Sequence, residues 1–138
     1  MEENGLITIR SSVPAKETIR RLLIAIKRRG MAIFAHIDHT REAKRVGLQL
    51  RPTDVFIFGY AEANIPLLLE KQTLGIDMPE RMLVWQDERD AVWISFNDPL
   101  WVGRRHNVNS DSRANLQAIR TSLMGIAIEA GALPPPAS

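Results

Sequence analysis

The sequence predicts an α+β domain in which a mostly antiparallel five-stranded sheet is covered on one face by two long helices. Three observations lead to this class. The expected order is strand, helix, four strands with short helical insertions, and helix. Consecutive strands are joined by tight turns, which antiparallel pairing allows and parallel pairing does not. Each long helix carries one apolar stripe, so each has a single face to bury.

The first part of the chain contributes a strand, a long helix and two further strands. Residues 5–12 alternate apolar and polar side chains, as a half-buried strand does. Residues 31–38 form the second strand, and residues 54–60 the third. The third strand is apolar on both faces, which favours a central position in the sheet. The helix after the first strand runs to about Arg29, with its apolar stripe at Ile19, Leu22, Leu23 and Ile26.

The second part contributes a short helix, two strands and the second long helix. Asn64 can cap the short helix, which covers roughly residues 65–72. Strands at 82–86 and 91–97 flank a charged turn, and residues 97–106 form a turn-rich connection. The long helix covers residues 110–130, with a buried stripe at Leu116, Ile119, Leu123, Ile126 and Ala130.

The register of the hairpin decides which side chains face the core. A loop with an even number of residues places Leu83 and Trp85 on the core face with Val92, Ile94 and Phe96. An odd loop places Trp85 and Trp93 together instead. We expect the even register, because it separates apolar from mixed residues better. The face without helices then needs a second subunit or a ligand to cover it, with candidates Phe34, Val84 and Trp93.

Composition places the chain among ordinary globular domains. Its 138 residues suit one domain over 1–131, followed by a disordered Pro-rich tail at 132–138. It has no cysteine, which excludes disulfides, thiolate metal sites and thiol catalysis. We expect a cytoplasmic protein, because the sequence shows neither a secretory signal pattern nor an apolar run long enough to span a membrane.

The charge is unevenly distributed along the chain. The net charge is +2, but residues 1–60 hold 11 Lys/Arg and 6 Asp/Glu, while residues 61–138 hold 7 and 10. This asymmetry suits self-association of opposite faces, or an anionic ligand near the basic part. The explanation that we favour is solvated surface of both signs.

The most concentrated polar motif is the stretch HIDHT at residues 36–40. Imidazole and carboxylate suit a divalent metal, and weak candidate ligands are His36, Asp38, His39 and His106. However, His36 and Asp38 are about 7 Å apart along an extended strand, which is wide for one ion. An acid/base enzyme could instead use Asp38 to orient His39, although no nucleophile is evident. The alternative that we favour is structural, with Asp38 capping the next turn.

A non-catalytic small-molecule site that includes this motif is a further alternative. It would be a mostly pre-formed pocket with a few polar groups and aromatic walls, lined by Asp38, His39, Thr53, Asn97, Phe34 and Trp93. No Gly-rich phosphate loop or dinucleotide fingerprint is present, so we expect no cofactor. The open sheet face offers few cations, so we do not favour nucleic-acid binding. The alternative that is kept is weak binding through the basic first helix.

Three segments resemble a known family: residues 36–59, 78–99 and 104–108. They contain an Ile-Asp-His segment, a Gly-Leu step, a Pro-Thr corner, a Phe-Gly strand end, a Pro-Leu-Val-Trp strand and an Asn-x-Pro turn. Here these are Ile37, Asp38, His39; Gly47, Leu48; Pro52, Thr53; Phe58, Gly59; Pro79, Leu83, Val84, Trp85; and Asn97, Pro99. Together they resemble the domain of unknown function family numbered 302.

The resemblance implies a fold similar to the TATA-box-binding protein half-domain, with a curved antiparallel sheet and two helices on its convex side. It also implies a homodimer, and it implies no established activity. The chain departs from the family pattern after Gly59. The family usually has Asn-Pro and then Gly-Thr there, whereas this chain has Tyr60-Ala61 and then Asn64-Ile65.

The sequence therefore predicts a cytoplasmic homodimeric module that binds a small anionic or apolar ligand, or a partner, without catalysis. Two alternatives from other classes remain. One is a metal-dependent or acid/base enzyme that uses Asp38 and His39. The other is a weak nucleic-acid binder that uses the basic first helix.

Overall fold

A computed structural model describes residues 4–132. Within this range the chain forms one five-stranded sheet in which every neighbouring pair is antiparallel, in the order β1-β5-β4-β3-β2. The strands are β1 (Leu6–Ser11), β2 (Ala32–Asp38), β3 (Thr53–Gly59), β4 (Glu80–Gln86) and β5 (Val92–Asn97). The helices are α1 (Ala15–Arg28), α2 (His39–Arg45), α3 (Ala61–Glu70), α4 (Pro99–Arg105) and α5 (Arg113–Gly131), with 3-10 turns η1 (Gln72–Ile76) and η2 (Ser110–Ser112).

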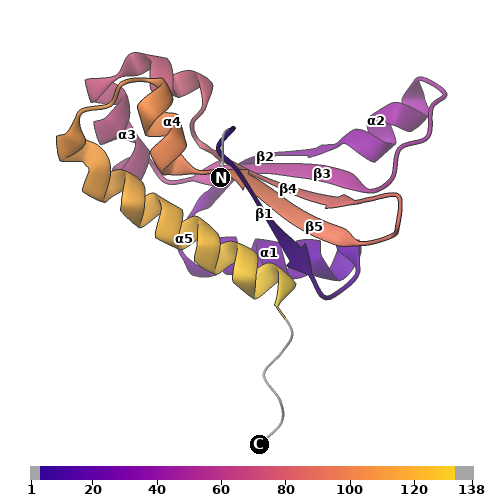
Figure 1. Cartoon of the computed structure of the whole chain (residues 1–138). Coiled ribbons are helices and arrows are strands. Elements are labelled where there is room, and N and C mark those ends of the chain that lie inside the picture. The colour runs from indigo at the N-terminus through magenta and orange to yellow at the C-terminus, as the bar shows by residue number, and fades with distance from the viewer. Residues whose placement is uncertain (1–3, 133–138) are drawn as a thin grey trace, which may run out of the picture.

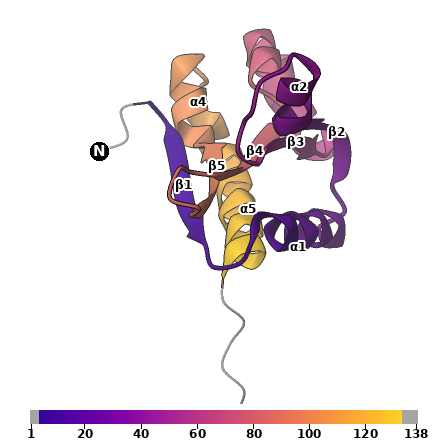
Figure 2. The same cartoon turned by 90° about the vertical axis from the view of Figure 1, so that its right-hand side faces the viewer.

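The two long helices, α1 and α5, lie side by side on one face of the sheet (Figures 1 and 2). α1 packs on β2 and β4, and α5 packs on β1 and β5. α3 and α4 stand together at one end of the sheet, and α2 stands at the opposite end, beyond β2 and β3 (Figure 1). This arrangement confirms the predicted α+β class and the placement of both long helices on one face.

The core lies between the sheet and the two long helices. Phe56 and Phe58 alternate along β3 and are fully buried, so Val55 and Ile57 point to the face without these helices. The neighbouring strands and both helices complete the same core with apolar side chains that are almost fully buried, namely Met82, Val84, Ile94, Leu22, Ile26, Leu123 and Ile126. β3 pairs with β2 on one side and with β4 on the other, which confirms its predicted position inside the sheet.

The expected register of the β4–β5 hairpin is wrong. Trp85 lies directly opposite Trp93, while Met82 and Val84 face the core opposite Phe96 and Ile94. The loop consists of residues 87–91, an odd number. The Asp87 carboxylate organises this loop by accepting hydrogen bonds from the backbone N–H groups of residues 89 and 91, at 2.9 and 3.0 Å. Val84 is therefore a core residue and not part of the open face.

Two helices differ from the sequence expectation. α3 begins at Ala61, and Asn64 lies buried within it instead of capping it. The connection at 97–106, predicted to be rich in turns, contains α4. Pro99 occupies the first turn, where a missing N–H is harmless, and the Asp98 carboxylate accepts the Leu100 N–H at 2.9 Å. Asp98 and Pro99 therefore start a helix.

Candidate functional site

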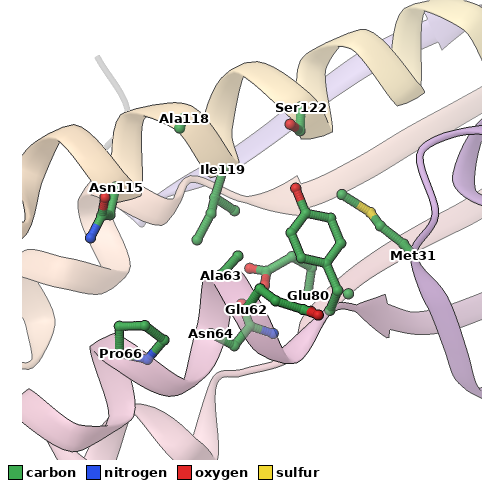
Figure 3. Close-up of a pocket in the computed structure, with 12 residues that line it drawn as sticks. Met31, Glu62, Ala63, Asn64, Pro66, Glu80, Asn115, Ala118, Ile119 and Ser122 are labelled. Atoms are coloured by element: carbon green, nitrogen blue, oxygen red, sulfur yellow. The ribbon is translucent and has the colours of Figure 1, made fainter.

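A cavity of about 160 Å³ lies between α3, the start of β4 and α5 (Figure 3). α5 lies on one side of it and α3 on the other (Figure 3). Its wall combines two carboxyl groups, two carboxamides, two hydroxyls and several apolar side chains. The lining residues are Met31, Gly59, Tyr60, Glu62, Ala63, Asn64, Pro66, Glu80, Asn115, Ala118, Ile119 and Ser122.

Strand pairing directs Glu80 into this cavity. Glu80 is the first residue of β4 and lies opposite Phe58, whose side chain is fully buried under the helices. Cross-strand partners point to the same face of a sheet, so Glu80 points toward the helices as well. At this end of the sheet α5 contributes the polar Asn115 and Ser122 to the wall of the same cavity.

Glu80 is the electrostatically unusual group of the cavity. Burial of the carboxyl raises its pKa from 4.5 to about 7, and a hydrogen bond with its own backbone opposes this shift only weakly. None of the ion pairs formed by residues 4–132 involves Glu80. A half-buried carboxyl without a cationic partner is a feature that clusters at functional sites.

Hydrogen bonds tie the walls of the cavity to the rest of the fold. The Glu70 carboxylate at the end of α3 accepts the backbone N–H of Asn109 at 2.6 Å and the hydroxyl of Ser112. These bonds lower the pKa of Glu70, the Ser112 hydroxyl most of all. The His106 ring bonds Asp77 at 2.6 Å and Thr73 at 2.9 Å, which connects α4 to η1. α3 is thus held against the segment that leads into α5.

The sequence-predicted residues Asp38, His39 and Thr53 lie near one another at the α2 end of the sheet. The Asp38 carboxylate accepts the Arg41 N–H at 2.9 Å and caps α2, as the structural interpretation expected. His39 is the first residue of α2 and is exposed. The Thr53 hydroxyl donates to the carbonyl of Arg51 at 2.8 Å. Each polar group except that of His39 therefore has a local structural role.

The other three predicted pocket residues lie elsewhere. Asn97 ends β5 opposite Leu6, at the far end of that strand from Trp93. Phe34 sits at a bulge in β2 and is 60% exposed. Trp93 is on the face of the sheet opposite to the long helices, whereas Asp38 shares the helix side with Asp54. The six residues are thus not gathered around one cavity, and ligand binding by Asp38 and His39 stays a prediction.

The weak metal candidates are also distributed over different elements. His36 stacks on Phe56 with ring centroids 4.3 Å apart, and its Nε2 lies 2.7 Å from the Asp54 carboxylate. His106 instead pairs with Asp77, between α4 and η1. Among residues 4–132 the structure contains no group of three or more His, Asp or Glu side chains placed to hold a metal ion.

The sheet face opposite the long helices carries a network of aromatic and polar groups. The indole N–H of Trp85 donates to the Ser95 hydroxyl at 2.9 Å, and that of Trp93 donates to Asp87 at 2.8 Å. The latter bond lowers the pKa of Asp87. The Trp85 and Trp93 rings are 6.3 Å apart, and the Arg10 guanidinium lies 5.4 Å from the Trp93 ring. Hydrogen bonds and ring contacts within this face thus hold its two tryptophan side chains in place, and the face is partly apolar.

Sequence reasoning missed Glu80 because of the hairpin register. Glu80, Met82 and Val84 alternate along β4 and share one face. The even register turned this face outward, where a glutamate is unremarkable. The odd register turns it inward and would have pointed to a carboxyl at the edge of the core. Sequence reasoning identified Tyr60 only as a departure from the family pattern and Asn64 also as a helix cap, yet both line the cavity.

These features define an α+β domain with one antiparallel sheet and a small, partly polar cavity that contains a carboxyl of raised pKa. Comparison with known sequences makes the assignment specific. Residues 7–127 match the family described as "Domain of unknown function DUF302", and the chain belongs to this family. The expected likeness to the TATA-box-binding protein half-domain stays a prediction.

A solved structure shares the fold. The crystal structure of an uncharacterized conserved DUF302 protein from Bacillus stearothermophilus matches with a TM-score of 0.82 over 92% of this chain and 98% of that chain. The sequences are 19% identical, so the likeness concerns the fold alone.

Curated relatives come from Brucella. A protein of Brucella suis biovar 1 named fluoride-specific ion channel FluC 1 is 38% identical over 119 residues, which is 86% of this chain and 47% of that protein. One of Brucella melitensis biotype 1, named fluoride-specific ion channel FluC 2, is equally similar, with 44% of its length covered. The chain thus spans about half the length of these relatives. Within residues 4–132, no helix combines the length and apolar character needed to cross a membrane.

Proposed function

We propose that this chain is a small-molecule-binding module and that the cavity between α3, β4 and α5 is its binding site. The observation that carries this proposal is the Glu80 carboxyl, which lines the cavity with a raised pKa and forms no ion pair within residues 4–132. Binding sites typically combine an apolar wall with a few polar groups that orient the ligand. The cytoplasmic location and the lack of catalysis expected from the sequence belong to this proposal.

The size of the cavity restricts the ligand. Its volume of about 160 Å³ is below the roughly 300 to 1,000 Å³ of sites for drug-sized molecules. Met31 and Ile119 offer apolar contact, while Asn64 and Asn115 can both donate and accept hydrogen bonds. The expected ligand is therefore a small molecule with a short apolar body and more than one polar group.

A cavity-filling variant tests this proposal. Ala118 lines the cavity from α5, and Ala118→Leu would occupy part of its volume. Ala114 is exposed on the same helix and does not line the cavity, so Ala114→Leu is the matched control. Small molecules from a fragment library should shift the amide NMR signals of residues 59–64 and 80 in the Ala114→Leu variant and not in Ala118→Leu. Equal binding to both variants would place the site elsewhere.

We also propose that the module is a homodimer, formed through the sheet face that carries Trp85 and Trp93. The long helices leave this face uncovered, and Ile37 at its β2 edge is 39% exposed. Apolar surface of this kind favours association. Sedimentation equilibrium at micromolar concentration should give a dimer mass for the unmodified chain and a monomer mass for Ile37→Asp. Leu69→Asp on α3, where Leu69 is 82% exposed, is the control that should remain dimeric. A monomeric unmodified chain would exclude this assembly.

The names of the Brucella relatives suggest a second candidate function, in which this domain assists a fluoride channel. The similarity covers 86% of this chain, which is the specific observation in its favour. The ion itself is not the ligand that we expect in the cavity, because the carboxyl groups of Glu62 and Glu80 line it and their ionised forms would repel an anion. A role in fluoride handling would then depend on another ligand or on a partner, which pull-down with a fluoride channel can test.

A further inference from the structure

The charged groups around the cavity indicate the charge of its ligand. Among the described residues that line it, two carry a carboxyl group, Glu62 and Glu80, and none is a lysine, arginine or histidine. Glu62 is exposed, whereas Glu80 is turned toward the helices. The cavity therefore contains a carboxyl that the fold removes from water without supplying a positive partner.

We propose that the cavity binds a small organic cation, an aliphatic amine whose ammonium group pairs with the Glu80 carboxylate. This inference rests on the proposed ligand-binding function and specifies the class of ligand. It differs from the small anionic or apolar ligand that the charge pattern of the sequence suggested.

The energetic argument compares three kinds of occupant. An anion would lie beside Glu80 and Glu62 with no cation to offset the repulsion. A neutral molecule would leave Glu80 protonated, or ionised and unpaired at a desolvation cost. An ammonium group supplies the missing positive partner and forms a charge-assisted hydrogen bond with the carboxylate, which is the stronger type. A cation is therefore the occupant that the wall favours.

The remainder of the wall suits the remainder of an alkylamine. Met31, Ala63 and Ile119 offer apolar contact to a short carbon chain. Figure 3 shows Asn115 and Ser122 on α5, across the cavity from Asn64 on α3, so a second polar group of the ligand also finds partners. Tyr60 adds an aromatic ring to the lining, and a ring face attracts cations.

Binding of an amine should depend on pH with a definite sign. Because the pKa of Glu80 is about 7, the carboxylate is the minor form at pH 6 and the major form at pH 8. If only the carboxylate pairs with the ammonium, affinity rises about tenfold from pH 6 to pH 8, while an amine with a pKa near 10 stays charged. Glu62 and Tyr60 are the other titratable groups that face the cavity, and no charged group faces it from α5.

A matched set of probes tests the inference on the full chain. Butylamine, butanol and butanoate share one carbon skeleton and differ in the charge of the head group. Titration calorimetry and amide NMR should detect butylamine as the tightest binder, with affinity about tenfold higher at pH 8 than at pH 6. Glu80→Gln should lose both the preference for the amine and its pH dependence. Glu88→Gln, which alters an exposed carboxyl of the hairpin loop outside the cavity, should keep both.

The outcomes separate this inference from the function on which it rests. Butanol or butanoate binding as tightly as butylamine would overturn the cationic ligand and leave a small-molecule site in place. An affinity for butylamine that is equal at both pH values, or unchanged in Glu80→Gln, would also overturn it. If none of the three probes and no fragment of the library shifts the cavity signals, the binding function fails, and the cationic ligand with it. Glu80→Asp keeps the charge and should retain amine binding if Glu80→Gln perturbs the fold.

Discussion

The protonation of Glu80 should make the stability of this domain fall as pH rises, and Glu80→Gln should remove that dependence. In the unfolded chain the carboxyl ionises near its ordinary pKa of 4.5, whereas in the folded chain burial raises the pKa to about 7. Between these values the folded state binds more protons than the unfolded state. The free energy of unfolding therefore decreases from pH 4.5 to pH 7 and levels off above pH 7.

The magnitude follows from the separation of the two pKa values. One pKa unit corresponds to about 1.4 kcal/mol, so raising the pKa from 4.5 to about 7 corresponds to about 3 kcal/mol over the whole range. Most of this change in the free energy of unfolding occurs between pH 5 and pH 8. Glutamine has nearly the shape of the protonated carboxyl and does not ionise. Between pH 5 and pH 8 the free energy of unfolding of Glu80→Gln should therefore increase by roughly 2 to 3 kcal/mol relative to that of the unmodified chain.

Urea denaturation of both proteins at pH 5, 6, 7 and 8 measures this difference directly. Other titrating groups are common to both proteins and cancel in the comparison. Glu88→Gln in the exposed hairpin loop is the control, and its difference from the unmodified chain should stay the same across the series. A stability difference for Glu80→Gln that is constant from pH 5 to pH 8 would refute the conclusion that burial keeps this carboxyl protonated.

Three further outcomes are expected. Asp38→Ala should remove the cap of α2 at a cost of about 1 kcal/mol, seen as faster amide hydrogen exchange in α2, while Asp38→Asn should keep the protection. Gly103→Ala should lower the free energy of unfolding by about 1 to 3 kcal/mol, because the new Cβ would lie 2.5 Å from the Leu116 side chain. Gly75→Ala, whose new Cβ would have its nearest neighbour at 3.8 Å, should cost less. Equal losses for the two variants in urea titrations would contradict this expectation. Sodium fluoride at millimolar concentration should leave the NMR signals of the cavity unshifted at pH 8.

Local sequence signals predicted those parts of the fold that depend on neighbouring residues. Asp38 precedes a short polar helix, and a carboxylate at that position caps it because the first N–H groups of a helix need acceptors. The alternation in β1 and the apolar stripes of the long helices placed these elements correctly, because each pattern has the period of its element. Pro99 was assigned to a turn in the sequence, but proline is favoured at the first position of a helix as well as in turns.

The candidate site was not predictable in the same way, because it depends on contacts between distant segments. The residues that line the cavity come from four stretches of the chain, from Met31 to Ser122. Glu80 in isolation is an ordinary charged residue at the start of a strand. Only its pairing opposite Phe58 and the passage of α5 over that end of the sheet make it a half-buried carboxyl.

The sequence by itself determined the α+β class, the order of the strands and the two long helices, the face-specific burial of these helices and the local roles of residues such as Asp38. The tertiary structure decided the hairpin register, which the loop of residues 87–91 sets. With this register Trp85 points to the open face and Glu80 points to the helix side. A shift of one residue in a strand exchanges its two faces, and hydrophobic pattern alone did not choose between them, since β4 carries apolar side chains on both. The charge preference that we propose for the cavity depends on that choice.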